Sequence, residues 1–338
     1  MKKFLAAVMC SALTLSSQVV AAEEKPVAIV IHGGAGTILK KNFTPELEKA
    51  YKDTLSEAAK AGYALLEQGE PGEKAVIAAI QILETSPLFN AGIGAVYTWE
   101  GEHELDASLM HGGTHNAGAV AGVKTIRSPI AAASAVMHLS PHVMLSGEGA
   151  EAFAEEQGLT LVDNHIFDTE RRLESLKKVK ARMESAGLYG DQKGNERFGT
   201  VGAVVLDSEG NLVAGTSTGG MTAKRYGRIG DSPVIGAGTW ADNDSCAVSA
   251  TGHGEFFIRY HVAADICTRM KYQGTTLKEA SDTVIFDVLK PVGGDGGIIA
   301  IDNEGNIAAP FNSAGMYRAK IDGKGVLSVG IFEQWDIL

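Results

Sequence analysis

Residues 198–221 read FGTVGAVVLDSEGNLVAGTSTGGM, and this stretch decides the fold of the chain. It contains two short extended runs, Thr200–Leu206 and Leu212–Ser217, separated by the turn sequence Asp207–Asn211. Small and β-branched residues on both sides of a Gly-Asn turn are typical of a β-hairpin. The pattern therefore predicts two antiparallel strands, with Thr200 opening the first.

The segment before the hairpin is strongly polar over residues 167–197 and ends at Gly199. A charged tether that meets a strand at Gly199–Thr200 is a place where the chain could be cut. A cut there would leave Thr200 with a free α-amino group beside its own hydroxyl, and that pair is a known form of activated nucleophile. A Gly-Thr pair is common, however, and taken alone it favours an ordinary hairpin.

The amino end has the pattern of a secretory signal peptide. Two lysines precede an apolar stretch, Phe4–Val20, and Val20–Ala22 forms a small-residue cleavage site before Glu23. The stretch is too short for a membrane span, and no later segment is long and apolar enough for one. We therefore predict that residues 1–22 are removed and that the protein is periplasmic or otherwise secreted.

Charge and composition narrow the range of partners. The formal net charge is −11, and it becomes −13 without the two lysines of the leader. Such acidity argues against nucleic acid and against anionic membrane surfaces as partners. A hydrophobic content of 45% supports a large core, in one layered domain or in two tightly fused halves.

Only two cysteines, Cys246 and Cys267, follow the leader. Export permits a disulfide, but two cysteines do not make a disulfide framework. Because free cysteine is often buried, we interpret both as small buried side chains rather than as a bridge.

After the leader, the strand Val27–Ile31 runs into a glycine-rich turn, His32–Gly36, and a helix over Thr44–Leu66 follows, with Thr44 as its N-cap. The turn lacks the third glycine of a dinucleotide fingerprint, and no Gly-Lys-Ser/Thr is present, which excludes both nucleotide motifs. His32 has no second metal-type residue at helical spacing, so we interpret it as a packed, hydrogen-bonded histidine.

Further elements follow in alternation up to the tether. We predict helices over Gly72–Glu84, Ile130–Met137 and Glu148–Gln157, paired strands over His103–Ser108 and Gly118–Val123, and a glycine-rich loop over Pro87–Ala95. The helix ending at Gln157 is the last before the tether. In the loop, Asn90 could donate an amide hydrogen bond into a pocket.

Two loops beyond the hairpin carry polar groups suited to a small zwitterion. Arg228 and Asp231 stand three apart in a glycine-spaced loop, where they form either a surface ion pair or contacts to a carboxylate and an amine. Thr251 follows a strand over Ser245–Ala250 and precedes a predicted helix that runs to about Met270. Backbone N–H groups there, with the Thr251 hydroxyl, could stabilise an oxyanion.

Taken together, seven motifs occur in one order over about residues 27–330: HGGAG, FNAGIGA, the charged tether, GTVG, GTSTGGM, GRIGDSP and ATGHGE. In this the chain resembles the plant-type L-asparaginase/isoaspartyl peptidase (β-aspartyl peptidase) family of N-terminal nucleophile hydrolases. The resemblance implies an α/β (α+β) fold, a four-layer αββα sandwich. It also implies a precursor that cuts itself between Gly199 and Thr200.

The resemblance divides the chain into an α subunit, residues 23–199 with a mobile tether over about 158–199, and a β subunit, residues 200–338, which together form one domain. It implies that Thr200 is the nucleophile, with its own amine as base. The other implied roles fall on residues of the matching motifs. Thr218 orients Thr200, Thr251 and Gly252 stabilise the oxyanion, and Asn90 lines the other side of the nucleophile. The substrate-binding residues are Arg228 for the carboxylate and Asp231 for the amine, with Thr251, Gly252 and Gly254 beside them.

The implied reaction is hydrolysis of β-aspartyl dipeptides and of the L-asparagine side-chain amide, without an organic cofactor. A structural sodium ion is implied on six backbone carbonyls, those of Leu83, Glu84, Ser86, Phe89, Ala91 and Ile93. The family usually assembles as two αβ units, an (αβ)2 heterotetramer.

Two other functions remain open from the sequence. A glycosylasparaginase, from a related branch, would more typically carry Asn at the position of Gly219 and would need room for a sugar. An exported amino-acid-binding protein could keep Arg228 and Asp231 without catalysis, although Thr200, Thr218 and Thr251 argue against it.

Overall fold

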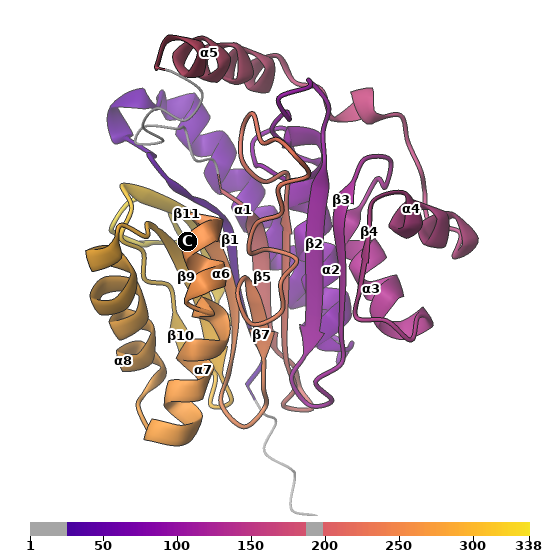
Figure 1. The fold of residues 1–338 in the computed structure, drawn as a ribbon. Helices are drawn as coiled ribbons and strands as arrows, with labels where there is room; N and C mark the ends of the chain where they lie inside the picture. The colour runs from indigo at the N-terminus through magenta and orange to yellow at the C-terminus, as the bar shows by residue number, and fades with distance from the viewer. Residues whose placement is uncertain (1–25, 187–198) are drawn as a thin grey trace, which may run out of the picture.

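The computed structural model describes residues 26–186 and 199–338. The predicted leader and residues 187–198 of the predicted tether lie outside the described residues. At the centre, the described chain forms two stacked β-sheets, one of nine strands and one of four (Figure 1). Thr200 directly precedes a strand in the middle of the larger sheet, as the hairpin pattern predicts.

The strand order places the hairpin centrally. The larger sheet runs β13 (Asp336–Ile337), β12 (Leu327–Gly330), β11 (Gly315–Ile321), β1 (Ala28–Gly36), β5 (Val201–Leu206), β6 (Leu212–Thr218), β2 (Leu105–His111), β3 (Ala117–Val123) and β4 (Met144–Ser146). The smaller sheet runs β10 (Ile307–Ala308), β9 (Gly296–Asp302), β8 (Cys246–Gly252) and β7 (Thr239–Ala241). Strands β5 and β6 pair antiparallel, which confirms the predicted hairpin.

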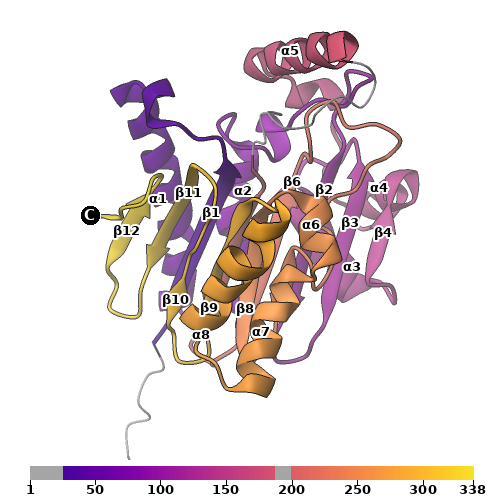
Figure 2. The same cartoon turned by 60° about the vertical axis from the view of Figure 1, so that its left-hand side comes forward.

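Helices cover the outer faces of both sheets. The larger sheet carries α1 (Pro45–Glu67), α2 (Gly72–Thr85) and α3 (Pro129–Leu139), with α4 (Gly147–Glu156) beside β3 and β4. The smaller sheet carries α6 (Gly254–Arg259), α7 (Val262–Gln273) and α8 (Leu277–Asp282), and Figure 2 shows α7 and α8 lying over β8 and β9. This order of layers confirms the expected αββα sandwich. Short 3-10 or π segments complete it: Lys40–Asn42, Gly92–Gly94, Asn164–Phe167, Thr283–Leu289 and Lys290–Val292.

Strand β1 shows how the layers are held together. Ile29 and Ile31 pack into the cluster under α1 and α2, whereas Ala28 and Val30 pack into the cluster between the two sheets. Successive side chains of a strand point to opposite faces, so a strand buried on both faces reads as a continuous apolar run. The α1 helix begins where Thr44 accepts a hydrogen bond from the Leu47 amide at 3.2 Å, which confirms the predicted N-cap.

The HGGAG segment is not the turn that its glycines predict. Strand β1 continues through it to Gly36, with an irregularity in register between His32 and Gly34. Strand β11 pairs along both sides of this irregularity, with Gly34 opposite Tyr317 and Gly36 opposite Gly315, and Gly34 has a φ of +112°. The prediction of a single helix running to Met270 is also wrong. The chain breaks between α6 and α7 at His261, whose φ of 48° is left-handed.

The first part of the predicted tether is a packed helix, α5 (Glu170–Ala186), which lies across one end of the sandwich (Figures 1 and 2). The prediction that the helix ending at Gln157 is the last before Gly199 is therefore wrong, whereas the mobility of the tether over about 158–199 stays a prediction. Leu176, Val179 and Met183 lie at helical spacing and pack against Tyr97, Trp99 and Ala223. The charged residues between them hid this narrow apolar face in the sequence.

Cys246 on β8 and Cys267 on α7 form a disulfide, with Cα atoms 5.2 Å apart. Both are buried, as expected, but the prediction that they are unpaired is wrong. The pairing depends on α7 packing against β8, and two cysteines separated by 21 positions give no sign of that contact in the sequence. Across residues 26–186 and 199–338, none of the helices combines the length and the apolar character needed to span a bilayer.

We expect the double substitution Cys246→Ala and Cys267→Ala to lower the free energy of unfolding by about 3 kcal/mol, because the bond closes a loop of roughly 20 residues in the unfolded chain. Urea unfolding of both proteins measures the difference. Peptide mapping of the unreduced protein should recover the two cysteines in one linked peptide. Free thiols at both positions in protein purified without reductant, or equal stability of the two proteins, would contradict the assignment.

Candidate active site

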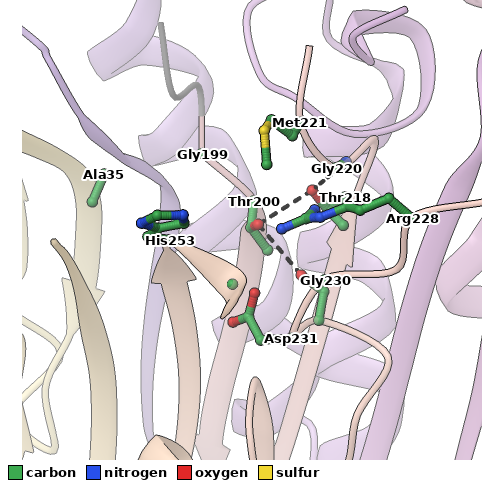
Figure 3. A pocket seen from close by; sticks show the side chains of 13 residues that line it. Ala35, Gly199, Thr200, Thr218, Gly220, Met221, Arg228, Gly230, Asp231 and His253 are labelled. Atoms are coloured by element: carbon green, nitrogen blue, oxygen red, sulfur yellow. Dashed lines mark hydrogen bonds between the residues drawn. The ribbon is translucent and has the colours of Figure 1, made fainter. Parts of the chain in front are cut away.

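Thr200 lies in a pocket at one end of the interface between the two sheets, and only 7% of its surface is exposed to solvent. Its hydroxyl donates to the Thr218 hydroxyl at 3.2 Å, and the Ser232 hydroxyl lies 3.4 Å away (Figure 3). The backbone N–H of Gly220 donates to Thr218 Oγ1 at 3.0 Å, which leaves the Thr218 oxygen oriented toward Thr200. The site therefore holds one threonine hydroxyl with a second hydroxyl aligned on it.

The backbone on both sides of Thr200 is held against β1. A Cβ on Gly199 would lie 2.1 Å from the Gly34 Cα and 2.5 Å from the Ala35 nitrogen, so only glycine fits before Thr200. Gly34 itself has a φ of +112°, which favours glycine. On the other side, His32 Nδ1 lies 2.9 Å from the Thr200 carbonyl oxygen. The HGGAG segment is thus a backbone cradle for the Gly199–Thr200 junction.

Arg228 and Asp231 line the same pocket, as the sequence predicts (Figure 3). Arg228 makes a bidentate contact with Glu255, from Nε at 2.9 Å and from Nη2 at 3.0 Å. No role for Glu255 was predicted from the sequence, although this residue stands in the ATGHGE motif. Two N–H groups of a guanidinium bound to one carboxylate have a fixed orientation, so Glu255 sets the direction in which Arg228 points.

Asp231 is a buried carboxyl whose Oδ2 has no hydrogen-bond partner among the described residues. Burial raises its pKa from 3.8 to about 7, while the charge on Arg228 opposes the shift and those on Glu255 and Asp106 add to it. A buried carboxylate with a free oxygen beside a guanidinium is chemically suited to bind an ammonium group.

Thr251, Gly252 and Gly254 lie on the opposite side of the pocket, at the end of β8 and the start of α6. Gly252 and Gly254 line the cavity, together with His253. Thr251 is fully buried and accepts a hydrogen bond from the Ala35 amide at 3.2 Å, so in this structure its hydroxyl contacts β1.

Asn90 lies beside the pocket rather than in its lining. Its side-chain amide donates to the Gly220 carbonyl at 2.8 Å and its side-chain oxygen accepts from the Val96 amide at 2.9 Å. Its backbone carbonyl accepts from Gly219 at 3.1 Å. Asn90 therefore fixes the Gly219–Gly220 turn, whose own N–H orients Thr218.

The loop expected to bind sodium has backbone carbonyls that converge. A Cβ on Gly94 would lie 1.9 Å from the Phe89 oxygen and 3.0 Å from the Ser86 oxygen, and one on Gly92 would lie 2.2 Å from the Glu84 oxygen. Hard cations take oxygen ligands of this kind, and these distances place three of the six expected carbonyls, those of Glu84, Ser86 and Phe89, close to the glycines of the loop. Within the described ranges, no cluster of three or more His, Cys, Asp or Glu side chains could hold a metal ion.

Two residues besides Glu255 have contacts in the site that were not predicted from the sequence. Ser232 stands in the GRIGDSP motif directly after Asp231, and its position is a signal that could have found it. His32 was interpreted as a packed histidine, which the structure confirms: it is fully buried, and burial lowers its pKa to about 3. Its contact with Thr200 comes from the β1–β5 pairing, which the sequence does not reveal.

Comparison with known proteins places this site in a family. The sequence profile of a family described as asparaginase matches residues 24–331. An isoaspartyl peptidase of Salmonella typhimurium is 52% identical over 86% of this chain and 94% of its own. A second isoaspartyl peptidase, from Escherichia coli, is 51% identical over 86% and 91%. An isoaspartyl peptidase/L-asparaginase of Mus musculus is 38% identical over 95% and 96%.

Replacing Asp231 with asparagine should stabilise the protein at alkaline pH. A folded pKa above the ordinary value of 3.8 means that the acid contributes stability below about pH 4 and loses it as the pH rises through about 7. Asparagine does not titrate, so we expect Asp231→Asn to raise the free energy of unfolding at pH 8 by on the order of 1–4 kcal/mol. Near pH 4 the pH-dependent part of the difference should vanish.

Urea unfolding at pH 4, 6 and 8 measures this, with Asp53→Asn on the exposed face of α1 as the matched control. A stability difference that does not change with pH would show that Asp231 is not the titrating group.

Proposed function

The chain belongs to the asparaginase family of N-terminal nucleophile hydrolases, and we propose from this membership and the site geometry that it is an isoaspartyl peptidase with L-asparaginase activity. The observation that carries the proposal is the position of Thr200. It stands at the start of a central strand, hydrogen-bonded to Thr218 and in one pocket with Arg228 and Asp231. A nucleophile and the two charges that a zwitterion needs are thus in the same cavity.

The proposed first step is self-cleavage. The amide bond between Gly199 and Thr200 breaks with the addition of water, leaving a carboxylate on Gly199 and a free α-amino group on Thr200. An α-amino group has an ordinary pKa of roughly 7.7–8.0, so near neutral pH it can accept the proton of the Thr200 hydroxyl. The close packing of Gly199 against Gly34 supports this site, because it holds the junction in one conformation.

In the proposed hydrolysis, Arg228 binds the substrate α-carboxylate and Asp231 its α-ammonium group. Thr200 Oγ1 attacks the side-chain amide carbonyl, and its proton passes through the Thr200 amine to the leaving nitrogen. Thr251 and Gly252 stabilise the oxyanion. The resulting β-aspartyl ester on Thr200 is hydrolysed by water, which releases aspartate and frees the hydroxyl. Preorganised donors of this kind usually provide the largest single share of such catalysis.

Substrate class follows from the same geometry. A β-aspartyl dipeptide and L-asparagine share the free α-amine and α-carboxylate, and they differ in the group that leaves. The relatives named above are isoaspartyl peptidases, and the mouse protein is also an L-asparaginase. The glycosylasparaginase alternative is not favoured. That branch would more typically carry Asn at position 219, where a Cβ would lie 2.7 Å from both Ala95 Cβ and Asn90 Oδ1.

Three further properties are proposed on the resemblance. A sodium ion would bind the carbonyls of the loop Leu83–Ile93 and stiffen the segment that carries Asn90, with no part in the reaction. Residues 1–22 would direct export to the periplasm or beyond. Two αβ units would associate. Intact mass showing an amino end at Glu23, and light scattering giving the mass of two αβ units, test the last two.

The variant Thr200→Ala tests the proposed nucleophile. We expect the wild-type chain to yield two fragments on a denaturing gel, the smaller beginning Thr200-Val-Gly-Ala, and the variant to remain one chain. Hydrolysis of β-aspartyl dipeptides and of asparagine should fall by about a thousandfold or more, because removing a nucleophile leaves only the binding contribution.

Thr54→Ala, in α1 and away from the pocket, is the matched control and should cut and turn over like the wild type. A wild-type chain that stays uncut and binds aspartate without turnover would instead establish a non-catalytic binding protein.

A further inference from the structure

Five polar side chains form a continuous hydrogen-bonded chain between the two sheets. We call this chain the hydroxyl seam, and it consists of His32 on β1, Ser249 on β8, Thr216 on β6, Thr239 on β7 and Ser108 on β2. All five are fully buried. The seam therefore joins three strands of the larger sheet to two strands of the smaller sheet, in an interface that elsewhere is apolar.

The distances along the seam are those of good hydrogen bonds. His32 Nε2 lies 3.0 Å from Ser249 Oγ, and Ser249 Oγ lies 2.7 Å from Thr216 Oγ1. Thr216 Oγ1 lies 2.5 Å from Thr239 Oγ1, which in turn lies 2.8 Å from Ser108 Oγ. Each hydroxyl has at least two neighbours, and the single hydrogen of Ser108 is shared between the Ser232 carbonyl and Thr239.

One end of the seam contacts Thr200 directly, and the other end contacts Ser232, a neighbour of Thr200. At one end, His32 Nδ1 lies 2.9 Å from the Thr200 carbonyl oxygen. At the other, Ser108 Oγ lies 2.6 Å from the Ser232 carbonyl oxygen, and the Ser232 hydroxyl lies 3.4 Å from Thr200 Oγ1. The seam thus connects a contact to the main chain of the nucleophile with a contact to its side chain.

The acceptor at the first end sets the direction of the hydrogen bonds. A carbonyl oxygen cannot donate, so His32 Nδ1 must carry the hydrogen, and in the neutral ring Nε2 is then an acceptor. Ser249 must donate to Nε2 and can only accept from Thr216. Thr216 Oγ1 is within hydrogen-bond distance of Ser249 Oγ at 2.7 Å and of the Gly238 carbonyl oxygen at 3.2 Å, and the shorter contact is the one to Ser249. Two contacts therefore define the tautomer of His32: the Thr200 carbonyl accepts from Nδ1, and the Ser249 hydroxyl donates to Nε2.

The backbone leaves space for this chain at one position. A Cβ on Gly202, in strand β5, would lie 2.0 Å from Ser249 Oγ and 2.5 Å from His32 Nε2. The His32–Ser249 hydrogen bond therefore passes directly over the Gly202 Cα. This accounts for the glycine in the GTVG motif, where a sheet residue with a side chain would fill the interface.

We propose that His32 is a positioning residue for Thr200, and that the hydroxyl seam holds it in the tautomer whose Nδ1–H binds the Thr200 carbonyl. The effect on turnover rests on the proposed function. A mere packing role would instead require only that the space between the sheets be filled. The two roles differ in which ring nitrogen matters, because only Nδ1 reaches Thr200.

Two amide substitutions separate the nitrogens. The side-chain nitrogen of asparagine takes the place of Nδ1 and that of glutamine the place of Nε2. We expect His32→Gln to lower kcat and the rate of self-cleavage by about 100-fold, the size of effect that misplacing a reacting group by about 1 Å can have. His32→Asn should lower both by no more than about tenfold. KM should stay within about threefold of wild type in both variants, because Arg228 and Asp231 are untouched.

The seam itself is tested with Thr216→Val and Thr216→Ser. The first removes a hydroxyl at constant shape and should lower kcat by about tenfold or more, whereas the second keeps the hydroxyl and should restore most of the loss. Ser281→Ala is the matched control. Ser281 is a buried serine of α8 whose hydroxyl has no hydrogen-bond partner among the described residues, so its kinetics should be those of the wild type.

A spectroscopic readout keeps the proposal testable if the variants do not fold or the wild type does not hydrolyse these substrates. Nitrogen-15 NMR of histidine-labelled wild-type protein should show His32 as the neutral Nδ1–H tautomer, and Ser249→Ala, which removes the donor to Nε2, should show a mixture. Loss of activity equal in His32→Asn and His32→Gln, or an Nε2–H tautomer in the wild type, would overturn the proposal. An inactive wild type that still cuts itself and shows the Nδ1–H tautomer would overturn only the proposed substrate.

Discussion

The hydrogen bond from His32 to the Thr200 carbonyl brings a polar group into an interface that the fold needs to be apolar. The two sheets pack through alternate side chains such as Val30, Val204 and Ile299, and an unsatisfied polar atom there would cost roughly 1–3 kcal/mol. The inward-facing residues are apolar over most of the strand and become polar only near the site. On β1 the inward-facing positions change from Ala28 and Val30 to His32 as the strand approaches the site. The polar part of the interface therefore lies on the same strands and the same face as the apolar core, at the end nearest the site.

Helix α5, in the predicted tether, contacts the surroundings of Thr200 through hydrogen bonds from arginine side chains to backbone carbonyls. Arg171 donates to the Leu88 carbonyl at 2.7 Å and Arg172 to the Gly94 carbonyl at 2.7 Å, so both arginines hold the loop that carries Asn90. Asn90 fixes the turn whose N–H orients Thr218. The proposed cut would separate residue 199 from residue 200 and leave all of these contacts in place. Helix α5 thus belongs to the body that positions the nucleophile, although its composition is that of a solvated linker.

The sequence revealed the elements whose signals are local. The Gly-Asn hairpin, the Thr44 cap and the helices α1 and α2 depend on residues a few positions apart, and the structure confirms them. The disulfide, the continuation of β1 through HGGAG and the packing of α5 depend on partners far along the chain. The sequence did not predict these three features. For the site, the motifs predicted Thr200, Thr218, Arg228 and Asp231, and the structure places all four in the lining of one pocket.

The residues that the sequence missed have roles that exist only between strands. Ser249 and Thr216 look like ordinary strand residues, and a hydroxyl at every second position is a weak signal in a single strand. It becomes a pattern only when the order β1–β5–β6 and the pairing of the sheets are known, since then the hydroxyls fall in one line. Glu255 is similar, because its meaning depends on Arg228 lying opposite.

Arg228 lies between the buried carboxyl of Asp231 and the partly exposed carboxylate of Glu255, and it is hydrogen-bonded to Glu255. Burial raises the pKa of Asp231 to about 7, and the positive charge of Arg228 offsets this shift only in part. Under the proposed function, the substrate ammonium group lies beside Asp231 and the substrate carboxylate lies against the edge of Arg228 that Glu255 does not occupy. The bound zwitterion then leaves the net charge of the pocket unchanged but gives each of the two buried groups a partner of opposite charge, so we expect ligands that lack either charge to bind more weakly.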